Sequence, residues 1–286
     1  MKLDPPYPMT APDIVYHYTS RETALEKILP TKKLRIGSLG NTNDPRETKE
    51  WGFPIVGSGV NSNNKGDFKR FIDLSSQYEQ VANSIRKEEW WALCTTQDDE
   101  DLVIPKAKDP DFTHFKWGHS RGRMWAQYAD CHKGVCLVID RELLHNAIVS
   151  AVGNDLIFCG SVKYVNEMNI VGFNYKPCAF QFSLNINSCD DVDSIVRDHI
   201  QKYHERFFLE KSLEWSSEVE FRWLINGVSG PYHIDISKAL RAVIVGVDFP
   251  VVYGPSLWRL CDDLGVKVER MFWINRIPTK QAWTAK

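Results

Sequence analysis

Short apolar segments typical of strands alternate with amphipathic segments typical of helices along most of the chain. The pattern predicts strands at residues 14–18, 91–95, 135–139, 218–225, 242–247 and 266–272. It predicts helices at residues 19–30, 67–89, 121–131, 191–213 and 256–264. Because helices and long loops separate these strands irregularly, we expect an α+β fold with a mixed central β-sheet flanked by helices.

The chain of 286 residues is expected to form one domain, 1–286, with long insertions. Residues 1–13 are interpreted as an N-terminal extension. Glycine, serine and asparagine predict a loop at residues 57–66, and a second loop is predicted at residues 98–111, which are first acidic and then rich in proline and lysine. Neither loop separates two self-sufficient halves, so the predicted core spans about residues 14–275.

Composition and charge exclude several classes of protein. The formal net charge of −2 and the isoelectric point near 6.5 give no basic field that would coat nucleic acid. The seven cysteines include no pair with the two-residue gap of a zinc knuckle or a redox dithiol. The N-terminus lacks the apolar stretch of a signal peptide, and no apolar run reaches membrane-spanning length. We therefore expect a cytoplasmic protein with no membrane partner.

Polar and apolar residues alternate over residues 218–225, as in a strand with one buried face. Glu218, Glu220 and Arg222 would then share the opposite face. One interpretation is a solvent-facing strand with a cross-strand ion pair. The other is a cleft wall, where neighbouring carboxylates shift each other's pKa values. The pattern alone leaves both open.

Two further segments carry candidate site residues. Asn43 and Arg46 lie in residues 39–47, whose Asn, Asp, Gly and Pro content predicts a structured turn. Trp125 and Tyr128 are three residues apart on a predicted helix. That spacing is typical of core packing, and it would also fit a surface that stacks on a nicotinamide or nucleobase ring.

His17 belongs to Tyr16-His17-Tyr18-Thr19-Ser20, where a predicted strand meets a predicted helix. Thr19 and Glu22 have the spacing of a capping box for that helix. His17 is interpreted either as a structural residue or as a group that holds a ribose or a phosphate beside the helix start. Glycine-rich phosphate loops, a nucleophile elbow and a His-Glu-x-x-His helix are all absent from the sequence.

The order of these motifs resembles a widespread bacterial family of uncharacterised domains. The resemblance covers about residues 14–250. It is carried by Tyr16-His17-Tyr18-Thr19-Ser20, Asn43-Asp44-Pro45-x-Glu47, Leu93-Cys94-Thr95, Met124-Trp125-x-x-Tyr128, His132-Lys133-Gly134-Val135-Cys136-Leu137 and Glu218-x-Glu220-x-Arg222.

The opening strand, the helix after it and the Lys-x-Leu-Arg turn at residues 32–35 are also similar to the start of ADP-ribosyltransferases that act on nucleic acids. RNA phosphotransferases built on the same fold begin in the same way. The resemblance implies an ADP-ribosyltransferase-like fold and NAD as a substrate. It implies that His17 holds the adenosine ribose of NAD and that Glu220 or Glu218 engages the nicotinamide ribose as the catalytic carboxylate. The aromatic residue that stacks on nicotinamide would be Tyr128, Trp125 or Tyr18.

The remaining residues expected to contact NAD complete this hypothesis. Arg222 or Arg46 would bind the pyrophosphate in bidentate fashion. The full set of residues expected to bind NAD is His17, Tyr18, Thr19, Asn43, Arg46, Trp125, Tyr128 and Arg222.

The leading hypothesis is therefore an enzyme of the glycosyltransferase class, an NAD-dependent ADP-ribosyltransferase without a metal. We expect a bacterial toxin or anti-phage effector that modifies nucleic acid, with RNA favoured, or protein, and an antitoxin protein could neutralise it. The alternatives are a metal-dependent nuclease that uses Asp44, Glu47 and Glu220, and a non-catalytic binding module.

Overall fold

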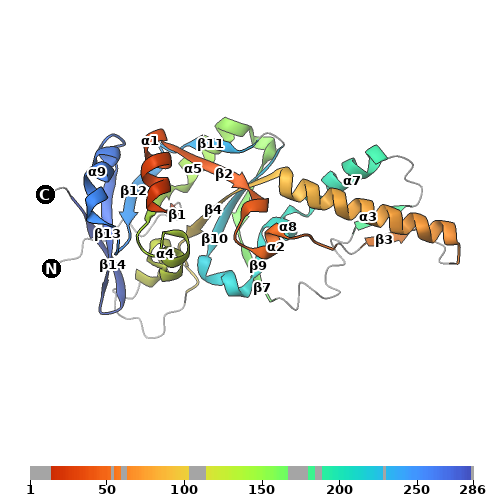
Figure 1. Ribbon diagram of the computed structural model, residues 1–286, viewed down its shortest axis with the longest axis horizontal. Coiled ribbons are helices and arrows are strands. Elements are labelled where there is room, and N and C mark those ends of the chain that lie inside the picture. The colour runs from red at the N-terminus through yellow and green to blue at the C-terminus, as the bar shows by residue number, and fades with distance from the viewer. Residues whose placement is uncertain are drawn as a thin grey trace.

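A large mixed β-sheet forms the centre of the computed structural model, and helices flank it (Figure 1). The structure describes residues 14–52, 55–58, 63–102, 114–166, 180–183, 189–227 and 230–284. The predicted α+β class is confirmed at this level. The predicted N-terminal extension, residues 1–13, and parts of the two predicted loops, residues 59–62 and 103–111, lie outside the described residues.

Ten strands of the described chain make up the central sheet. They are β1 (Ile14–Thr19), β2 (Lys33–Ser38), β4 (Trp90–Gln97), β5 (Val135–Asp140), β6 (Ile157–Ser161), β10 (Glu220–Asn226), β11 (Tyr232–Asp235), β12 (Leu240–Val245), β13 (Lys267–Ile274) and β14 (Ile277–Ala282). The strand order is β11-β2-β4-β1-β5-β12-β13-β14, with β10 paired to β4 and β6 paired to β10. The pairs are antiparallel except for β12 with β13.

Two short parallel pairs form separate two-stranded sheets. They are β3 (Ile55–Ser58) with β8 (Phe180–Ser183), and β7 (Lys163–Val165) with β9 (Glu210–Ser212).

Most predicted helices form where the apolar pattern places them. The structure has α3 (Lys65–Glu88), α4 (Gly122–Tyr128) and α9 (Gly254–Asp262), and a short α2 (Pro45–Thr48). It adds α5 (Arg141–Val152), which the sequence analysis does not predict. The single helix predicted at residues 191–213 is wrong, because this segment breaks into α7 (Cys189–Lys202), α8 (His204–Phe208) and strand β9.

The helix after β1 also begins differently from the prediction. It contains the π-helical turn η1 (Thr23–Ile28) and then α1 (Leu29–Thr31). The hydroxyl of Ser20 accepts a hydrogen bond of 3.1 Å from the backbone nitrogen of Thr23. The cap is therefore Ser20, and the predicted capping box of Thr19 and Glu22 is wrong, since Glu22 makes no side-chain cap bond.

Strand β4 has a divided edge, and this division positions the site. Along one edge β4 pairs with β10 over its whole length. The other edge is shared: β1 pairs with Thr96 and Gln97, while β2 pairs with Trp91 and Ala92. Among the described strands, none therefore pairs with residues 93–95 on this edge, and the sheet opens between β1 and β2.

The two faces of the sheet are packed in different ways. One face carries a single large core, in which α5, α9 and η1 cover residues such as Val15, Leu137 and Trp223. The opposite face carries two separate cores. In the first, α4 packs on Tyr16, Tyr18 and neighbouring strands; in the second, α3, α7 and α8 pack on Trp90, Leu224 and their neighbours. Polar residues of β4 and β10 lie between these two cores.

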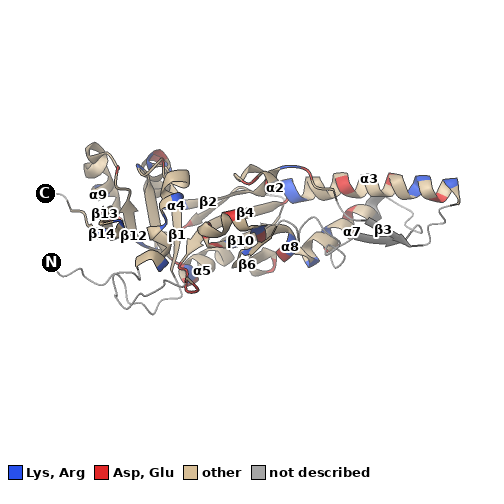
Figure 2. Ribbon diagram, turned by 90° about the horizontal axis from the view of Figure 1, so that it is seen from below, with Lys and Arg blue, Asp and Glu red and all other residues tan. Residues whose placement is uncertain are grey.

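Helix α3 extends well beyond the sheet, with α7 beside it (Figure 1). Both signs of charge occur along α3, so it presents no basic stripe (Figure 2). In the described part of the chain, no helix combines the length and the apolar character needed to cross a bilayer.

Candidate functional site

A cavity of about 320 Å³ opens at the place where β1 and β2 separate from β4. Its wall includes residues of β1, β2, β4, α4, β9 and β10 and of the turn before α2. Among the predicted site residues, the cavity is lined by His17, Tyr18, Asn43, Tyr128, Glu218, Glu220 and Arg222. The chain thus brings together residues from its N-terminal strand and from the late strand β10.

His17 fills the gap in the β4 edge. Its Nδ1 lies 3.3 Å from the carbonyl oxygen of Cys94, which is one of the residues without a strand partner on that edge. Because a carbonyl only accepts, Nδ1 carries the proton and Nε2 is an acceptor. Burial lowers the pKa of His17, and the bond to Cys94 opposes this in part, so the ring is neutral at pH 7. His17 is therefore both a structural residue and a hydrogen-bond acceptor in the cavity wall.

Glu220 and Arg222 lie on the cavity face of β10 and are almost fully buried. The Nε of Arg222 donates to Glu220 Oε1 at 2.6 Å, and Nη2 donates to Oε2 at 3.0 Å. Arg222 Nη1 also donates to the carbonyl oxygen of Phe208 at 2.8 Å. Burial alone would raise the pKa of Glu220, but Arg222 and Lys211 lower it to about 2. The interpretation of a solvent-facing strand is thus wrong, and the row forms a cavity wall.

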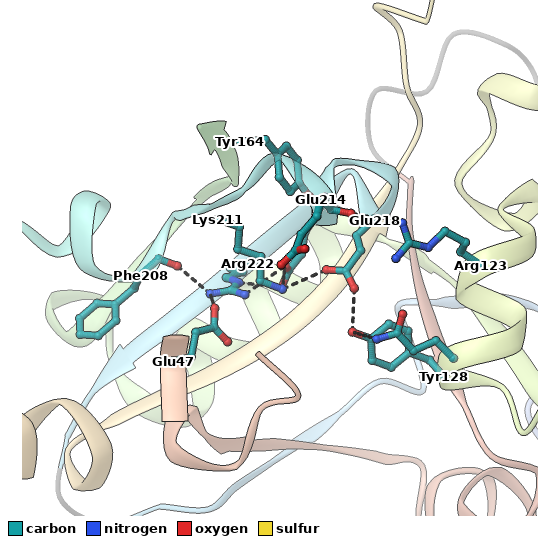
Figure 3. Close-up of polar contacts among 11 residues, drawn as sticks. Glu47, Arg123, Tyr128, Tyr164, Phe208, Lys211, Glu214, Glu218 and Arg222 are labelled. Carbon is teal, nitrogen blue, oxygen red and sulfur yellow. Dashed lines mark hydrogen bonds and ion pairs between the residues drawn. The ribbon is translucent and has the colours of Figure 1, made fainter. Parts of the chain in front are cut away.

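Lys211 is a site residue that the sequence analysis missed. Its Nζ lies 2.9 Å from Glu218 Oε2 (Figure 3). It also lies 2.9 Å from Glu220 Oε2, so Lys211 holds the two carboxylates together. Burial opposes its charge, but the carboxylates, Glu220 foremost, raise its pKa above the ordinary value for lysine. The sequence placed Lys211 inside a long helix, whereas it lies on the three-residue strand β9. Strands this short leave no readable periodicity.

Glu218 does not lie on β10 as predicted. It is the last residue of the 3₁₀ segment η7 (Leu213–Glu218), and Val219 joins it to β10 in a left-handed conformation with φ 43° and ψ 60°. Tyr128 of α4 donates to Glu218 Oε1 at 2.7 Å (Figure 3). Burial and the nearby Glu218 carboxylate raise the pKa of Tyr128, so it remains a donor throughout the neutral range.

Three aromatic candidates have different environments. Tyr128 and Tyr18 line the cavity, and Tyr18 donates to the carbonyl oxygen of Gly118 at 2.6 Å. Trp125 is 1% exposed, packs edge-on against Tyr18 and donates to the carbonyl oxygen of His119. Trp125 is thus a core residue outside the cavity lining, as is Thr19 at the end of β1.

The turn before α2 and the helix itself form a further part of the cavity wall. Asn43, Asp44 and Glu47 line the cavity, while Arg46 lies on α2 with its side chain outside the described part. Glu47 Oε1 lies 2.5 Å from Arg222 Nη1, an ion pair without hydrogen-bond geometry (Figure 3). This contact connects α2 to β10.

The acidic residues of the nuclease hypothesis, Asp44, Glu47 and Glu220, line the same cavity. However, the guanidinium of Arg222 pairs with both Glu47 and Glu220 and thus joins them. Among the described residues, no three His, Cys, Asp or Glu side chains are grouped so that they could hold a metal ion.

Comparison with known proteins gives one partial match. A family model described as a protein of unknown function (DUF2971) matches residues 124–223, which run from α4 into β10 and include Tyr128, Lys211, Glu218, Glu220 and Arg222. The resemblance to an uncharacterised domain family is confirmed over that range. No curated protein and no solved structure matches the chain significantly.

Proposed function

We propose that the chain is an NAD-dependent ADP-ribosyltransferase whose active site is the cavity between β1, β4 and β10, with a fold related to that superfamily. One observation carries the proposal. His17 and the pair Glu218 and Glu220, which the resemblance matches to the two ends of an NAD site, line one cavity although they are far apart in the sequence.

Hydrogen-bonding capacity favours Glu218 as the carboxylate that meets the substrate. A carboxylate offers about four acceptor positions. Glu220 already receives two hydrogen bonds from Arg222 and a contact from Lys211. Glu218 receives one bond from Tyr128 and one from Lys211, so two positions remain for a ribose hydroxyl. In this proposal Glu218 is the catalytic residue, and Glu220 and Arg222 position it through Lys211.

The proposed reaction breaks the bond between C1′ of the ribose and the nicotinamide nitrogen. The electron pair leaves with nicotinamide, and the ribose develops positive charge in an oxocarbenium-like transition state. The Glu218 carboxylate stabilises that charge, and an acceptor nucleophile attacks C1′ and loses its proton. Nε2 of His17 accepts a hydroxyl hydrogen of the other ribose, and the ring of Tyr128 or Tyr18 packs against nicotinamide.

The proposed biological role rests on the resemblance to ADP-ribosyltransferases that act on nucleic acids. It is a cytoplasmic toxin or anti-phage effector with RNA, other nucleic acid or protein as acceptor, and with an antitoxin protein as a partner.

The test is release of nicotinamide from NAD by the purified chain. Glu218→Gln keeps the volume of the side chain and removes its charge, so we expect a loss of turnover of about 100-fold or more. Glu214→Gln is the matched control, because it makes the same change at an exposed position of the same segment, and its turnover should equal that of the wild type. Thermal unfolding of both variants checks that the fold is retained.

Two results would overturn the proposal. One is a wild-type chain that neither binds NAD in calorimetry nor releases nicotinamide. The other is a folded Glu218→Gln variant with full turnover, which would remove Glu218 from the reaction.

A further inference from the structure

The charges around the cavity are unevenly matched. Four carboxylates line it, from Asp44, Glu47, Glu218 and Glu220, against the buried cations Lys211 and Arg222 and the exposed Arg35. Lys211 contacts Glu218 and Glu220, and Arg222 uses two of its nitrogens on Glu220. Lys211 therefore serves the carboxylates at β10, whereas Arg222 also contacts Glu47 on the side of α2.

Glu47 is a carboxylate on that side of the cavity with hydrogen-bonding capacity left unused among the described residues. The residue is 7% exposed and lines the cavity. In the described part of the chain, its ion pair joins Oε1 to Arg222 Nη1, and that nitrogen donates its hydrogen bond to the carbonyl oxygen of Phe208. The buried guanidinium of Arg86 also interacts electrostatically with Glu47. Within the described residues, Glu47 Oε2 is buried and has no hydrogen-bond partner. A buried carboxylate oxygen without a donor is unfavourable, so a ligand that supplies one gains affinity there.

Thr42 extends the same corner of the cavity. Its Oγ1 is buried and, among the described residues, lacks a hydrogen-bond partner, and Thr42 also lines the cavity. We call Thr42, Asp44 and Glu47 the α2 corner. It combines two carboxylates with a free hydroxyl, so it suits a group with N–H donors and a positive charge.

We infer that the α2 corner binds the nicotinamide end of NAD⁺, a pyridinium ring whose carboxamide carries two N–H donors. This inference rests on the proposed function. The Glu47 carboxylate faces the positive ring, and Glu47 Oε2 or Thr42 Oγ1 accepts from the carboxamide. Glu47 of this corner and Glu220 both contact Arg222, so the corner lies beside Glu220. Glu220 is in turn next to Glu218, the carboxylate proposed to meet the ribose.

The position of Glu47 determines which kinetic constant it affects. The positive charge is on the pyridinium before the bond breaks and spreads to the adjacent ribose in the transition state. A carboxylate beside both groups stabilises ground state and transition state to a similar degree, which lowers KM without raising kcat. Glu218 is expected to affect kcat instead of KM, because it acts on charge that develops during the reaction.

The test compares three ligands by calorimetry: NAD⁺, NADH, whose ring is neutral, and ADP-ribose, which lacks the ring. Wild type should bind NAD⁺ about tenfold more tightly than NADH. Glu47→Gln, whose amide oxygen can still face Arg222, should weaken NAD⁺ about tenfold or more and ADP-ribose less than twofold, and it should raise KM more than it lowers kcat. Thr42→Val, which keeps every charge, should weaken NAD⁺ but not ADP-ribose. Glu205→Gln on the surface is the control.

The outcomes separate this inference from the proposed function. If wild type binds none of the three ligands, the proposed function fails. If NAD⁺ and ADP-ribose bind but NADH binds as tightly as NAD⁺, the α2 corner does not hold the cationic ring. Equal weakening of NAD⁺ and ADP-ribose in a folded Glu47→Gln or Thr42→Val variant overturns the inference in the same way.

Discussion

Val219 determines how Glu218 and Glu220 meet in the cavity. With φ 43° and ψ 60°, it lies in the left-handed region, which β-branched residues rarely adopt. The turn at Val219 places Glu218 outside the strand while Lys211 still contacts both carboxylates at 2.9 Å. The strained backbone of Val219 thus helps to set the relative positions of Glu218 and Glu220 in the site.

A pair of substitutions tests this strain. Glycine adopts the left-handed region freely, whereas alanine pays about 1–2 kcal/mol there. Glycine also loses more conformational entropy on folding, so we expect Val219→Gly to be more stable than Val219→Ala by about 0.5–1 kcal/mol. In an ordinary strand the order is reversed. Urea unfolding of both variants measures the difference, and a more stable alanine variant would mean that Val219 is not strained.

At the scale of elements, α2 depends on α3 through one buried side chain. Arg86 donates to the carbonyl oxygen of Glu47 at 2.7 Å and to that of Lys49 at 2.5 Å. Its guanidinium also lies 4.7 Å from the ring centre of Trp51. These carbonyls are at the C-terminal end of α2, where no further turn of the helix supplies donors. Arg86 therefore holds the helix that carries Glu47.

Arg86→Lys should weaken the attachment of α2 to α3. Lysine keeps the charge but cannot donate to two carbonyls as a planar fork. We expect a loss of about 1–3 kcal/mol in the free energy of unfolding. We also expect the substitution to speed up backbone hydrogen exchange in α2, relative to the wild type, and to leave exchange in α9 unchanged. Arg259→Lys, on the exposed face of α9, is the control. Unchanged exchange at α2 would show that other contacts hold the helix.

The elements that could be predicted are those with long-range periodicity. The 24-residue helix α3 and the apolar strand β5 follow directly from their patterns. Strand β9, with three residues, and the break between α7 and α8 leave no such signal. The same limit applies to the site: Glu218, Glu220 and Arg222 are visible as a row, but their partner Lys211 is not. Contacts between β9 and β10 depend on the tertiary fold, which periodicity does not encode.

At the scale of the whole molecule, the site is a buried network of five charged side chains that joins distant parts of the chain. Glu47, Lys211, Glu218, Glu220 and Arg222 each contact at least one other member. Removing one partner of such a network leaves an uncompensated buried charge, which typically costs about 3–5 kcal/mol. We therefore regard the network as a structural element of the molecule as well as a site.

The network makes the stability of the fold depend on pH. Burial would raise the pKa of Glu220, but Arg222 and Lys211 lower it from 4.5 to about 2. A carboxyl with a depressed pKa in the folded state stabilises the fold fully above its unfolded pKa. That contribution is lost as the pH falls through the folded pKa. Glu220 should therefore contribute on the order of 3 kcal/mol above pH 4.5, and this contribution should decline between about pH 4.5 and pH 2.

Comparison with Glu220→Gln isolates this contribution from the other carboxyl groups, because both proteins share them. At pH 7 the variant should be less stable by about 3–5 kcal/mol, since Arg222 and Lys211 lose an anionic partner. Below pH 4.5 the difference between the two free energies of unfolding should shrink, because Glu220 of the unfolded wild type then binds a proton that the folded protein, with its lower pKa, does not bind. Urea unfolding of both proteins at pH 7, 5, 4 and 3 measures this difference in the free energy of unfolding. A difference that stays constant over this range would mean that Glu220 is not held ionised by Arg222 and Lys211.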